Sequence, residues 1–485
     1  MVNSSNKDRF YSTFEAMSRR RSKPFFENLE VLDAGAKGKS VAKAPDGRVV
    51  FINNAVPGDV VDVQTFKKRK AYFEGSAVAF KKYSDKRTEP LCDYFGLCGG
   101  CKWQNLKYEE QLFYKQKEVV NNLQRLGGVE LPEVMPILGS SDQYHYRNKM
   151  EYSFSDTKWI TAEQIADGSA IVDRRALGFH KPGMWDKVVD IDQCFLPLDR
   201  TNEIRNFIRD YAKEHDLSFF NLRNQHGLLR SLMIRTTSTG EIMVLLQFFE
   251  NDKDSIDRLM KELDVQFPDI TSLLYVINQK SNDTLYDQEI HCFSGQEYIT
   301  EQMEGLRFRI TAKSFYQTNS HQAHKLYEVT RNLANLKGDE IVYDLYTGTG
   351  TIAQFVAKQA AKVIGVESVP EAIDAARKNA EINQISNVEF VVGDMKNVLT
   401  TAFFQEHGTP DVIIVDPPRD GMHKDVVETI LASDVPRIVY VSCNSATQAR
   451  DLALMDDKYA IKVVQPVDMF PQTAHVENIV LLEKR

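Results

Sequence analysis

The sequence lacks the long apolar runs of a membrane protein. No stretch of about 18 consecutive apolar residues occurs among its 485 residues, so we expect no membrane-spanning helix. Residues 1–24 carry a basic cluster but no apolar core of the kind that a secretory signal peptide has. We therefore expect a cytoplasmic protein that does not associate with membranes.

Internal repeats and low-complexity tracts are also absent, so the chain is not expected to form a repeat array. Its residues are 42% hydrophobic and 26% charged, which is enough apolar material for ordinary hydrophobic cores. At about 150 residues each, the length predicts roughly three domains.

The chain lacks a net positive charge: 60 Lys and Arg stand against 68 Asp and Glu, which gives a net charge of −8. It is unevenly distributed, however: residues 1–90 hold 18 Lys and Arg against 11 Asp and Glu, a net charge of +7. This segment contains the runs Arg19–Arg21 and Lys67–Lys70. A polyanion such as RNA needs only a local basic face, although solvated surface charges would give the same pattern.

Residues 24–85 read as short strands broken by turns. Asp46-Gly47 lies between two alternating runs and indicates a hairpin, and Pro57-Gly58 indicates a second turn. The pattern predicts a small N-terminal β-barrel. Three aromatic residues flank its basic run and suit base stacking, although core packing would also explain them: Phe66, Tyr72 and Phe73.

Residues 86–310 mix helical and strand-like patterns and predict a central α+β domain. The clearest elements are a helix at 108–125 and strands at 149–154, 229–236 and 242–249.

Residues 311–485 alternate between strand-like and helical stretches. This order predicts an α/β domain with a parallel, Rossmann-like sheet that has helices on both faces. The chain closes with two extended runs and no helix between them, which predicts an antiparallel pair of strands at the edge of the sheet.

A glycine loop, Asp344–Ala353, follows the first strand of this domain and fits G-x-G-x-x-A. Glu367 ends the next strand, where a carboxylate can accept hydrogen bonds from a ribose. NAD and S-adenosylmethionine both present a ribose, so the loop alone does not distinguish them, and a structural glycine turn is a third possibility. The terminal strand pair favours a methyltransferase, as does Asp394, which is placed to bind an adenine amine.

Cys443 stands where a strand gives way to a helix, in YVSCNSATQARDL. Strand ends of this kind border the ligand crevice of open α/β sheets, and a helix N-terminus is expected to lower a thiol pKa. A small core residue is the alternative. Asp416-Pro417-Pro418 ends the preceding strand, and Glu477, just before the last strand, is the candidate general base.

A thiolate, a base and a methyl donor together suggest methylation at C5 of uracil. Thiolate addition at C6 makes an enolate that attacks the methyl sulfonium through C5, and a base then removes the C5 proton so that the thiolate can leave.

These motifs resemble the RNA uracil-5-methyltransferase family, specifically its ribosomal-RNA (23S) members, from about residue 24 to 485. The resemblance implies a TRAM RNA-binding domain at 24–85, a central domain at 86–310 and a methyltransferase domain at 311–485. It makes Cys443 the nucleophile and Glu477 the base. Phe315–Asn319 is similar to the family's F-x-Q-x-N element. Together with the ribose and adenine positions, the expected donor- or site-binding residues are Gln317, Tyr346, Thr351, Glu367, Asp394 and Asp416; Thr351 stands where the family often has Asn.

The resemblance also implies a [4Fe-4S] cluster on Cys92, Cys98, Cys101 and Cys194, which organises the central domain. Four thiolates are what such a cluster needs, with zinc as the rival ion. The sixth cysteine, Cys292, has no role in the family, and we expect it to be buried.

These motifs and cysteines argue against three rival functions. An NAD-dependent dehydrogenase leaves Cys443 and the cysteine quartet unused, and a non-enzymatic RNA-binding module needs no reactive thiol. A zinc deaminase fails because no P-C-x-x-C follows His475-Val-Glu477. Within the family, a transfer-RNA methyltransferase is the alternative, but that branch generally lacks both the barrel and the cysteines. We expect a monomer that acts on ribosomal RNA.

Overall fold

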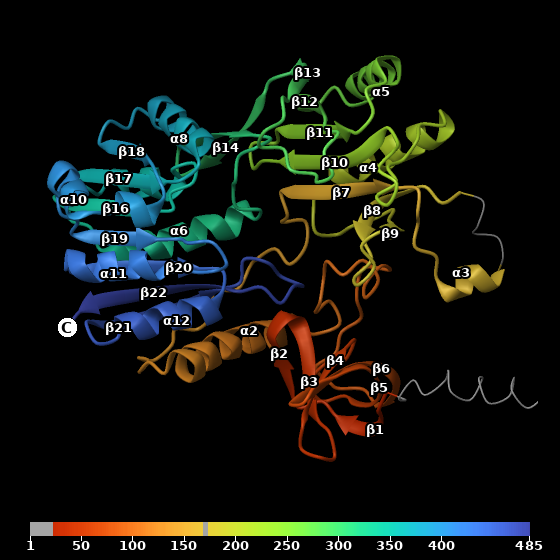
Figure 1. The fold of residues 1–485 in the computed structure, drawn as a ribbon, viewed down its shortest axis with the longest axis horizontal. Coiled ribbons are helices and arrows are strands. Elements are labelled where there is room, and N and C mark those ends of the chain that lie inside the picture. The colour runs from red at the N-terminus through yellow and green to blue at the C-terminus, as the bar shows by residue number, and fades with distance from the viewer. Residues whose placement is uncertain (1–22, 168–172) are drawn as a thin grey trace, which may run out of the picture. The chain divides into compact units, whose positions relative to one another are not determined.

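The computed structural model describes residues 23–167 and 173–485, so the Arg19–Arg21 run lies outside the described residues. The chain divides into two compact units (Figure 1). The smaller one runs to Glu89 and includes Asn105–Lys107, and the larger one comprises Pro90–Gln104 and Tyr108–Arg485.

The smaller unit is a six-stranded sheet in the order β1-β5-β6-β4-β3-β2, in which only the β4–β6 pair is parallel. Its strands are β1 (Phe25–Glu30), β2 (Asp33–Gly35), β3 (Lys39–Lys43), β4 (Val49–Asn53), β5 (Val60–Lys68) and β6 (Tyr72–Lys82). Alternate side chains fill one core, including Val50, Ile52, Val61 and Val63. Both expected turns are confirmed, because β3 and β4 form a hairpin around Gly47 (φ 83°) and Gly58 (φ 94°) turns the chain into β5.

The basic run of this unit is only partly neutralised. Glu74 binds the ammonium groups of both Lys39 and Lys67, which lower the pKa of its carboxyl to about 2. The following Lys68, Arg69 and Lys70 form no ion pair with the described part of the chain. These three cations therefore stay available to an anionic partner.

The larger unit begins with the cysteine segment and a long helix, α2 (Tyr108–Asn122), which ends in a π-helical turn (Leu123–Gly127). A seven-stranded sheet follows, in the order β13-β12-β11-β10-β7-β8-β9. Its strands are β7 (Lys149–Ser155), β8 (Ala176–His180), β9 (Val188–Asp190), β10 (Leu229–Thr236), β11 (Ile242–Phe248), β12 (Ile270–Ile277) and β13 (His291–Gly295); its helices are α3 (Ala162–Asp167), α4 (Asp199–Glu214) and α5 (Lys253–Gln266). The predicted helix and three strands of this region are confirmed. Cys292 is exposed, so its expected burial is wrong, because β13 is an edge strand of the sheet.

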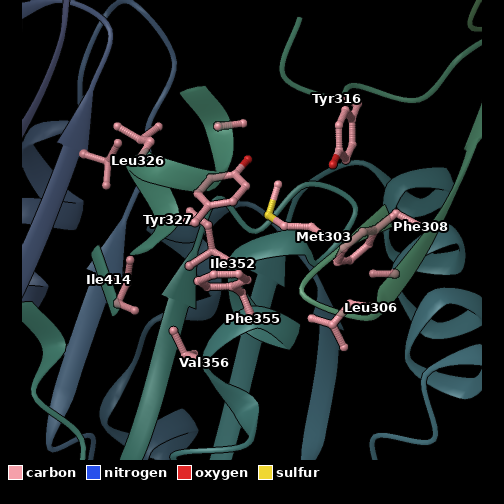
Figure 2. Close-up of a cluster of buried hydrophobic side chains, with 14 of the residues drawn as sticks. Met303, Leu306, Phe308, Tyr316, Leu326, Tyr327, Ile352, Phe355, Val356 and Ile414 are labelled. Carbon is pink, nitrogen blue, oxygen red and sulfur yellow. The ribbon is translucent and has the colours of Figure 1, made fainter. Parts of the chain in front are cut away.

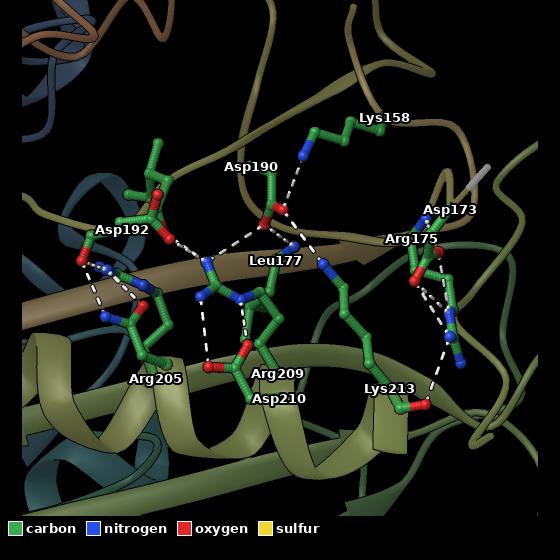
Figure 3. A network of polar contacts seen from close by, with 12 residues as sticks. Lys158, Asp173, Arg175, Leu177, Asp190, Asp192, Arg205, Arg209, Asp210 and Lys213 are labelled. Atoms are coloured by element: carbon green, nitrogen blue, oxygen red, sulfur yellow. Dashed lines mark hydrogen bonds and ion pairs between the residues drawn. The ribbon is translucent and has the colours of Figure 1, made fainter. Parts of the chain in front are cut away.

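Ion pairs hold the other edge of this sheet to α4. Asp190, at the end of β9, accepts hydrogen bonds from the ammonium groups of Lys158 (3.0 Å) and Lys213 (3.2 Å). Arg209 lies 3.6 Å from the same carboxylate and donates to Asp192 Oδ1 at 2.7 Å (Figure 3). Because Asp190 is nearly buried, this network stabilises the edge more than exposed pairs would.

The last sheet has the order β18-β17-β16-β19-β20-β22-β21 and is parallel except for β22, which runs antiparallel between β20 and β21. The expected antiparallel pair is confirmed. The strands are β16 (Ile341–Leu345), β17 (Lys362–Glu367), β18 (Val388–Val392), β19 (Val412–Val415), β20 (Arg437–Ser442), β21 (Tyr459–Val467) and β22 (Glu477–Lys484). The helices are α6 (Ser320–Ala334), α7 (Thr351–Ala357), α8 (Pro370–Ile382), α9 (Met395–Val398), α10 (Thr401–His407), α11 (Lys424–Ser433) and α12 (Ser445–Met455).

Successive residues of these strands bury on opposite faces, as the two-residue period of a strand requires. Val342 belongs to the core under α6, α7 and α8, and its neighbour Tyr343 to the core under α10, α11, α12 and α2. Helices thus cover both faces, as predicted.

The first of these cores also includes side chains from the other seven-stranded sheet, which contains β10 and β11. Met233 and Leu245 from that sheet share it with Phe355 of α7. Met303, Leu306 and Phe308, from the hairpin of β14 (Tyr298–Met303) and β15 (Leu306–Thr311), belong to the same core (Figure 2). Residues 90–104 and 108–485 form one compact unit, and the domain limits 24–85, 86–310 and 311–485 stay predictions.

A buried ion pair ties α2 to the loop that precedes β22. Lys115 and Asp468 are both fully buried, with Nζ and Oδ1 2.5 Å apart, and Asp468 Oδ2 accepts from Tyr108 Oη at 2.9 Å. Burial lowers the pKa of Lys115, which Asp468 opposes. Because removing one partner of such a pair typically costs about 3–5 kcal/mol, this contact holds the loop in a single position.

Candidate active site

A cavity of about 950 Å³ opens in the larger unit and collects nearly all of the predicted site residues. Its walls include Gln317, Tyr346, Thr351, Glu367, Asp416, Cys443 and Glu477, together with the four cysteines Cys92, Cys98, Cys101 and Cys194. Asp394 is not part of the wall. Residues from three distant stretches of sequence therefore meet around one space, large enough for a nucleoside-containing ligand.

The glycine loop after β16 shapes one side of this cavity. Tyr346 (φ 65°), Gly348 (φ 56°) and Gly350 (φ 74°) all have left-handed backbone conformations. A Cβ atom on Gly350 would lie 2.6 Å from Phe390, so close packing requires glycine there. A Cβ atom on Gly348 would meet nothing within 4 Å, which leaves room for a ligand to approach the backbone.

Glu367, at the end of β17, faces this loop. Its carboxylate accepts hydrogen bonds from the backbone N–H groups of Gly348 (3.2 Å), Ser368 (2.7 Å) and Val369 (3.0 Å). Asp394 instead caps α9 by accepting from the N–H of Lys396 at 3.2 Å. Glu367 thus lines the cavity, whereas Asp394 caps a helix and does not line the cavity.

Cys443 follows β20 and precedes α12, as predicted. Asn444 caps α12 by accepting from the N–H of Ala446 (3.2 Å), and its side-chain amide donates to the carbonyl of Arg419 (2.9 Å). Thr447 Oγ1 donates to the same carbonyl at 3.0 Å. The turn that carries Cys443 is therefore bonded to the loop that carries Asp416.

The antiparallel pairing of β20 and β22 brings Glu477 to Cys443. Ser442 is the partner of Asn478, so the residues immediately beyond them, 443 and 477, stand at the same end of the two strands. Glu477 is only 6% exposed, and both side chains line the cavity.

Burial dominates the electrostatics of this end of the cavity. It raises the pKa of Glu477 to about 8 and that of Asp416 to about 7, and in each case a neighbouring carboxyl adds to the rise. Arg419 partly opposes the shift at Glu477. Neither carboxyl forms an ion pair with another described residue, and both therefore hold protons near neutral pH.

The expected lowering of the Cys443 pKa is wrong. Burial, followed by the negative charges of Glu477 and Asp416, raises the pKa of this thiol to about 11. The cap of α12 begins one residue later, and its dipole is outweighed. The free protein consequently keeps Cys443 as a thiol, and a neighbouring group has to accept its proton when it reacts.

The four cysteines of the quartet are half-buried and surrounded by N–H donors. Gln104 Nε2 donates to Cys101 Sγ at 3.1 Å, and backbone N–H groups stabilise the thiolates of Cys92 and Cys194. Burial raises the pKa of all three thiols, to about 12 for Cys101 and about 11 for Cys194. Cys101 is within electrostatic range of the other three. Donors of this kind stabilise metal-bound thiolates.

The cysteine segment also contacts the loop that leads to Glu477. The backbone N–H groups of Lys102 (2.9 Å) and Trp103 (3.1 Å) donate to the carbonyl of Gln472. The Gln111 amide donates to Gln472 Oε1 and accepts from the Gln472 N–H, both at 3.0 Å. Gln472 has a left-handed conformation (φ 68°), and these bonds hold it there.

Sequence reasoning missed several residues of the wall, among them Arg147 and Lys313. Arg147 lies with its guanidinium 5.9 Å from the ring centre of Phe470, and its N–H donates to the carbonyl of Leu196 at 2.8 Å. Neither residue belongs to a motif, and only the fold brings them to the cavity.

Comparison with known proteins accounts for this arrangement. The family model of tRNA (uracil-5-)-methyltransferases matches residues 231–485, and the TRAM domain model matches 27–78. The chain belongs to the RNA uracil-5-methyltransferase family. Members of this family transfer a methyl group from S-adenosylmethionine to C5 of uracil in RNA, which replaces the dehydrogenase alternative. None of the described helices is long and apolar enough to cross a membrane.

Individual relatives agree with this assignment. Proteins named uncharacterized RNA methyltransferase from Bacteroides thetaiotaomicron and Porphyromonas gingivalis are 55% and 52% identical and cover 93% and 94% of this chain, which in turn covers 100% and 99% of them. The tRNA (uracil-54, C5)-methyltransferase of Pyrococcus abyssi, solved with S-adenosyl-L-homocysteine, is 28% identical with a TM-score of 0.72, over 94% of this chain and 100% of that one. Its bound product supports the use of S-adenosylmethionine by this fold.

Replacing Glu477 with glutamine should stabilise the protein in a pH-dependent way. In the unfolded chain this carboxyl ionises above its ordinary pKa of 4.5, whereas in the folded protein it ionises only near 8. The free energy of unfolding of the wild type therefore falls as the pH rises from 4.5 to 8. Glutamine does not titrate. The gain in the free energy of unfolding should therefore grow by on the order of 2–4 kcal/mol from pH 5 to pH 8.

Urea unfolding at pH 5, 6.5 and 8 measures this gain. Glu262→Gln, the same change at an exposed position of α5, is the matched control and should show no trend. An equal gain from Glu477→Gln at pH 5 and pH 8 would show that the fold does not raise the pKa of Glu477.

Proposed function

We propose that this methyltransferase acts on a uridine of ribosomal RNA, of the 23S type, through a covalent bond between Cys443 Sγ and C6 of the uracil. The observation that carries the proposal is the meeting of Cys443, Glu477 and the glycine loop in one cavity. A thiol, a base and a donor site at one place are what C5 methylation of a pyrimidine needs.

In the proposed reaction, the Cys443 thiol transfers its proton to a water molecule in the cavity, and its sulfur adds to C6. The resulting enolate attacks the methyl group through C5, and the donor leaves as a neutral thioether. Glu477, in its carboxylate form, then removes the C5 proton, the C5–C6 double bond re-forms, and the thiolate is expelled. A carboxyl whose pKa is raised towards neutral is well matched to this proton transfer.

We assign the remaining wall residues to binding. Gln317, Tyr346, Thr351 and Glu367 surround the space beside Gly348 and are proposed to hold the methyl donor, and Asp416 is proposed to face the uracil. Asp394 is close enough to affect the pKa of Tyr346, but it lies outside the wall, and its contact with adenine stays a prediction.

We also propose that Cys92, Cys98, Cys101 and Cys194 hold a [4Fe-4S] cluster. Zn–S bonds of about 2.3 Å bring four sulfurs within about 4 Å of one another. Among the described residues, no group of three or more His, Cys, Asp and Glu side chains converges enough to hold a metal ion. The C-x5-C-x2-C spacing of Cys92, Cys98 and Cys101 and the N–H donors favour a cluster over zinc, and its proposed role is to order the segment that bonds to Gln472.

Ribosomal RNA is preferred to transfer RNA because the chain has both the TRAM domain and the cysteine quartet. Transfer RNA is kept as the second candidate, since the Pyrococcus abyssi relative of the same fold is a tRNA (uracil-54, C5)-methyltransferase.

Two substitutions test the covalent mechanism. Cys443→Ala should reduce turnover by at least about 10³-fold while binding of S-adenosylmethionine is unchanged, because the sulfur contacts only the uracil. Glu477→Gln should accumulate a protein–RNA adduct that survives denaturing electrophoresis, because elimination lacks its base. A fully active Glu477→Gln variant would remove this residue from the mechanism.

The cluster has a direct chemical test. Anaerobically purified protein should contain about four iron and four sulfide ions per chain, and Cys101→Ser should lose both. Cys292→Ser, at the exposed cysteine outside the quartet, is the matched control and should keep them. Stoichiometric zinc in place of iron would contradict the proposal.

The substrate is tested by incubating the protein with labelled donor and unmodified RNA transcripts, followed by mapping of the modified nucleoside. We expect 5-methyluridine in 23S ribosomal RNA and none in transfer RNA. Label in transfer RNA alone would establish the second candidate.

A further inference from the structure

The loop between β8 and β9, residues 181–187, presents an exposed aromatic side chain in an ordered setting. The indole of Trp185 is 58% exposed. Three backbone hydrogen bonds close the loop: Lys181 N to Lys187 O (2.8 Å), Met184 N to Lys181 O (2.9 Å) and Lys187 N to Met184 O (3.1 Å). The indole is therefore held in solvent by a defined turn.

An arginine from a separate segment lies over this indole. The guanidinium of Arg223 is 5.2 Å from the ring centre of Trp185, and its Nε donates to Asp186 Oδ2 at 2.7 Å. Asp186 is buried and anchored through its carbonyl, which accepts from the hydroxyl of Thr157. The Arg223 side chain nevertheless stays 60% exposed, so a flat cation and a flat ring are presented together.

The loop lies directly on the cysteine segment. A Cβ atom on Gly99 would be 2.2 Å from Pro182, and Lys181 Nζ donates to the carbonyl of Leu97 at 3.2 Å. Phe179, just before the loop, lines the cavity, as does Cys98. The loop that carries Trp185 thus packs on the cysteine segment, which forms part of the wall of the candidate active site.

Single exposed aromatic residues are common on protein surfaces and need no function. This one differs in three respects: it is held by an ordered loop, it is paired with an anchored arginine, and its loop packs on the cysteine segment that lines the cavity. Aromatic rings and guanidinium planes, with nearby lysines for phosphates, are the means by which proteins bind unpaired bases of RNA.

We infer that Trp185 and Arg223 form a stacking platform for an unpaired base of the substrate RNA near the target uridine, with Lys181 beside it for the backbone phosphates. The inference rests on the proposed function, because it takes the substrate RNA as the occupant.

The kinetic test uses Trp185→Ala, Trp185→Phe and Arg223→Gln with unmodified ribosomal RNA transcripts and labelled donor. Trp185→Ala should raise the KM for RNA about 10-fold and change kcat less than about 2-fold, because a stacked base binds the ground state and takes no part in the chemistry. Arg223→Gln should raise KM less, and Trp185→Phe should restore most of the affinity. Val265→Ala, at a position 75% exposed on α5, is the control and should change neither constant.

A fluorescence measurement tests binding without catalysis. The chain has three tryptophans, of which Trp103 is only 4% exposed and Trp159 is half-buried, so acrylamide quenches mainly Trp185. Ribosomal RNA should protect the wild-type protein from quenching and should protect Trp185→Phe much less.

Unchanged KM in Trp185→Ala together with unprotected fluorescence would overturn the platform while leaving the methyltransferase function intact. Wild-type protein that forms no 5-methyluridine would overturn the proposed function, and the quenching assay would still decide whether the platform binds RNA. Protection by a protein partner but not by RNA would also overturn the inference.

Discussion

The whole site depends on one pairing, the antiparallel insertion of β22 between β20 and β21. In a fully parallel sheet, the start of the last strand would lie at the opposite edge from the end of β20. Running antiparallel, β22 instead begins where β20 ends, and Glu477 meets Cys443. A register slip of one residue would turn the carboxyl to the other face of the sheet, so the hydrophobic packing of β22 on both faces also positions Glu477, the proposed base.

That register is supported from outside the sheet. Lys115 and Gln111 on α2, and the backbone after Cys101, bond to Asp468 and Gln472 in the loop before β22. The same helix follows the cysteine segment in the chain. A buried ion pair and an amide pair therefore connect the cysteine segment and α2 to the loop before β22, and the proposed cluster would act on this loop through these contacts.

Local patterns predicted much of the fold, because two-residue and 3.6-residue periods report burial directly. Strand β10 is predicted to the residue, and Cys443 stands at its expected strand end. The predictions were wrong where the three-dimensional surroundings of a residue, and not the local sequence, determine its pKa or its burial. A helix terminus contributes about 0.3–1 kcal/mol, less than one pKa unit, and burial beside two carboxyls outweighs it at Cys443. The exposure of Cys292 and the arrival of Arg147 at the cavity depend on long-range packing that no local pattern encodes.

The acidity of the cavity wall bears on the order of events in turnover. Glu367, Asp416 and Glu477 line one cavity, which is proposed to receive a donor with a permanent positive charge that departs as a neutral thioether. Carboxylates in the cavity wall attract the positively charged donor but not the neutral thioether. Methyl transfer therefore weakens the binding of the used donor. Charge as well as concentration then favours the replacement of the used donor by a fresh one. We expect Asp416 and Glu477 to release protons when the cation binds and to take them up again when it is consumed.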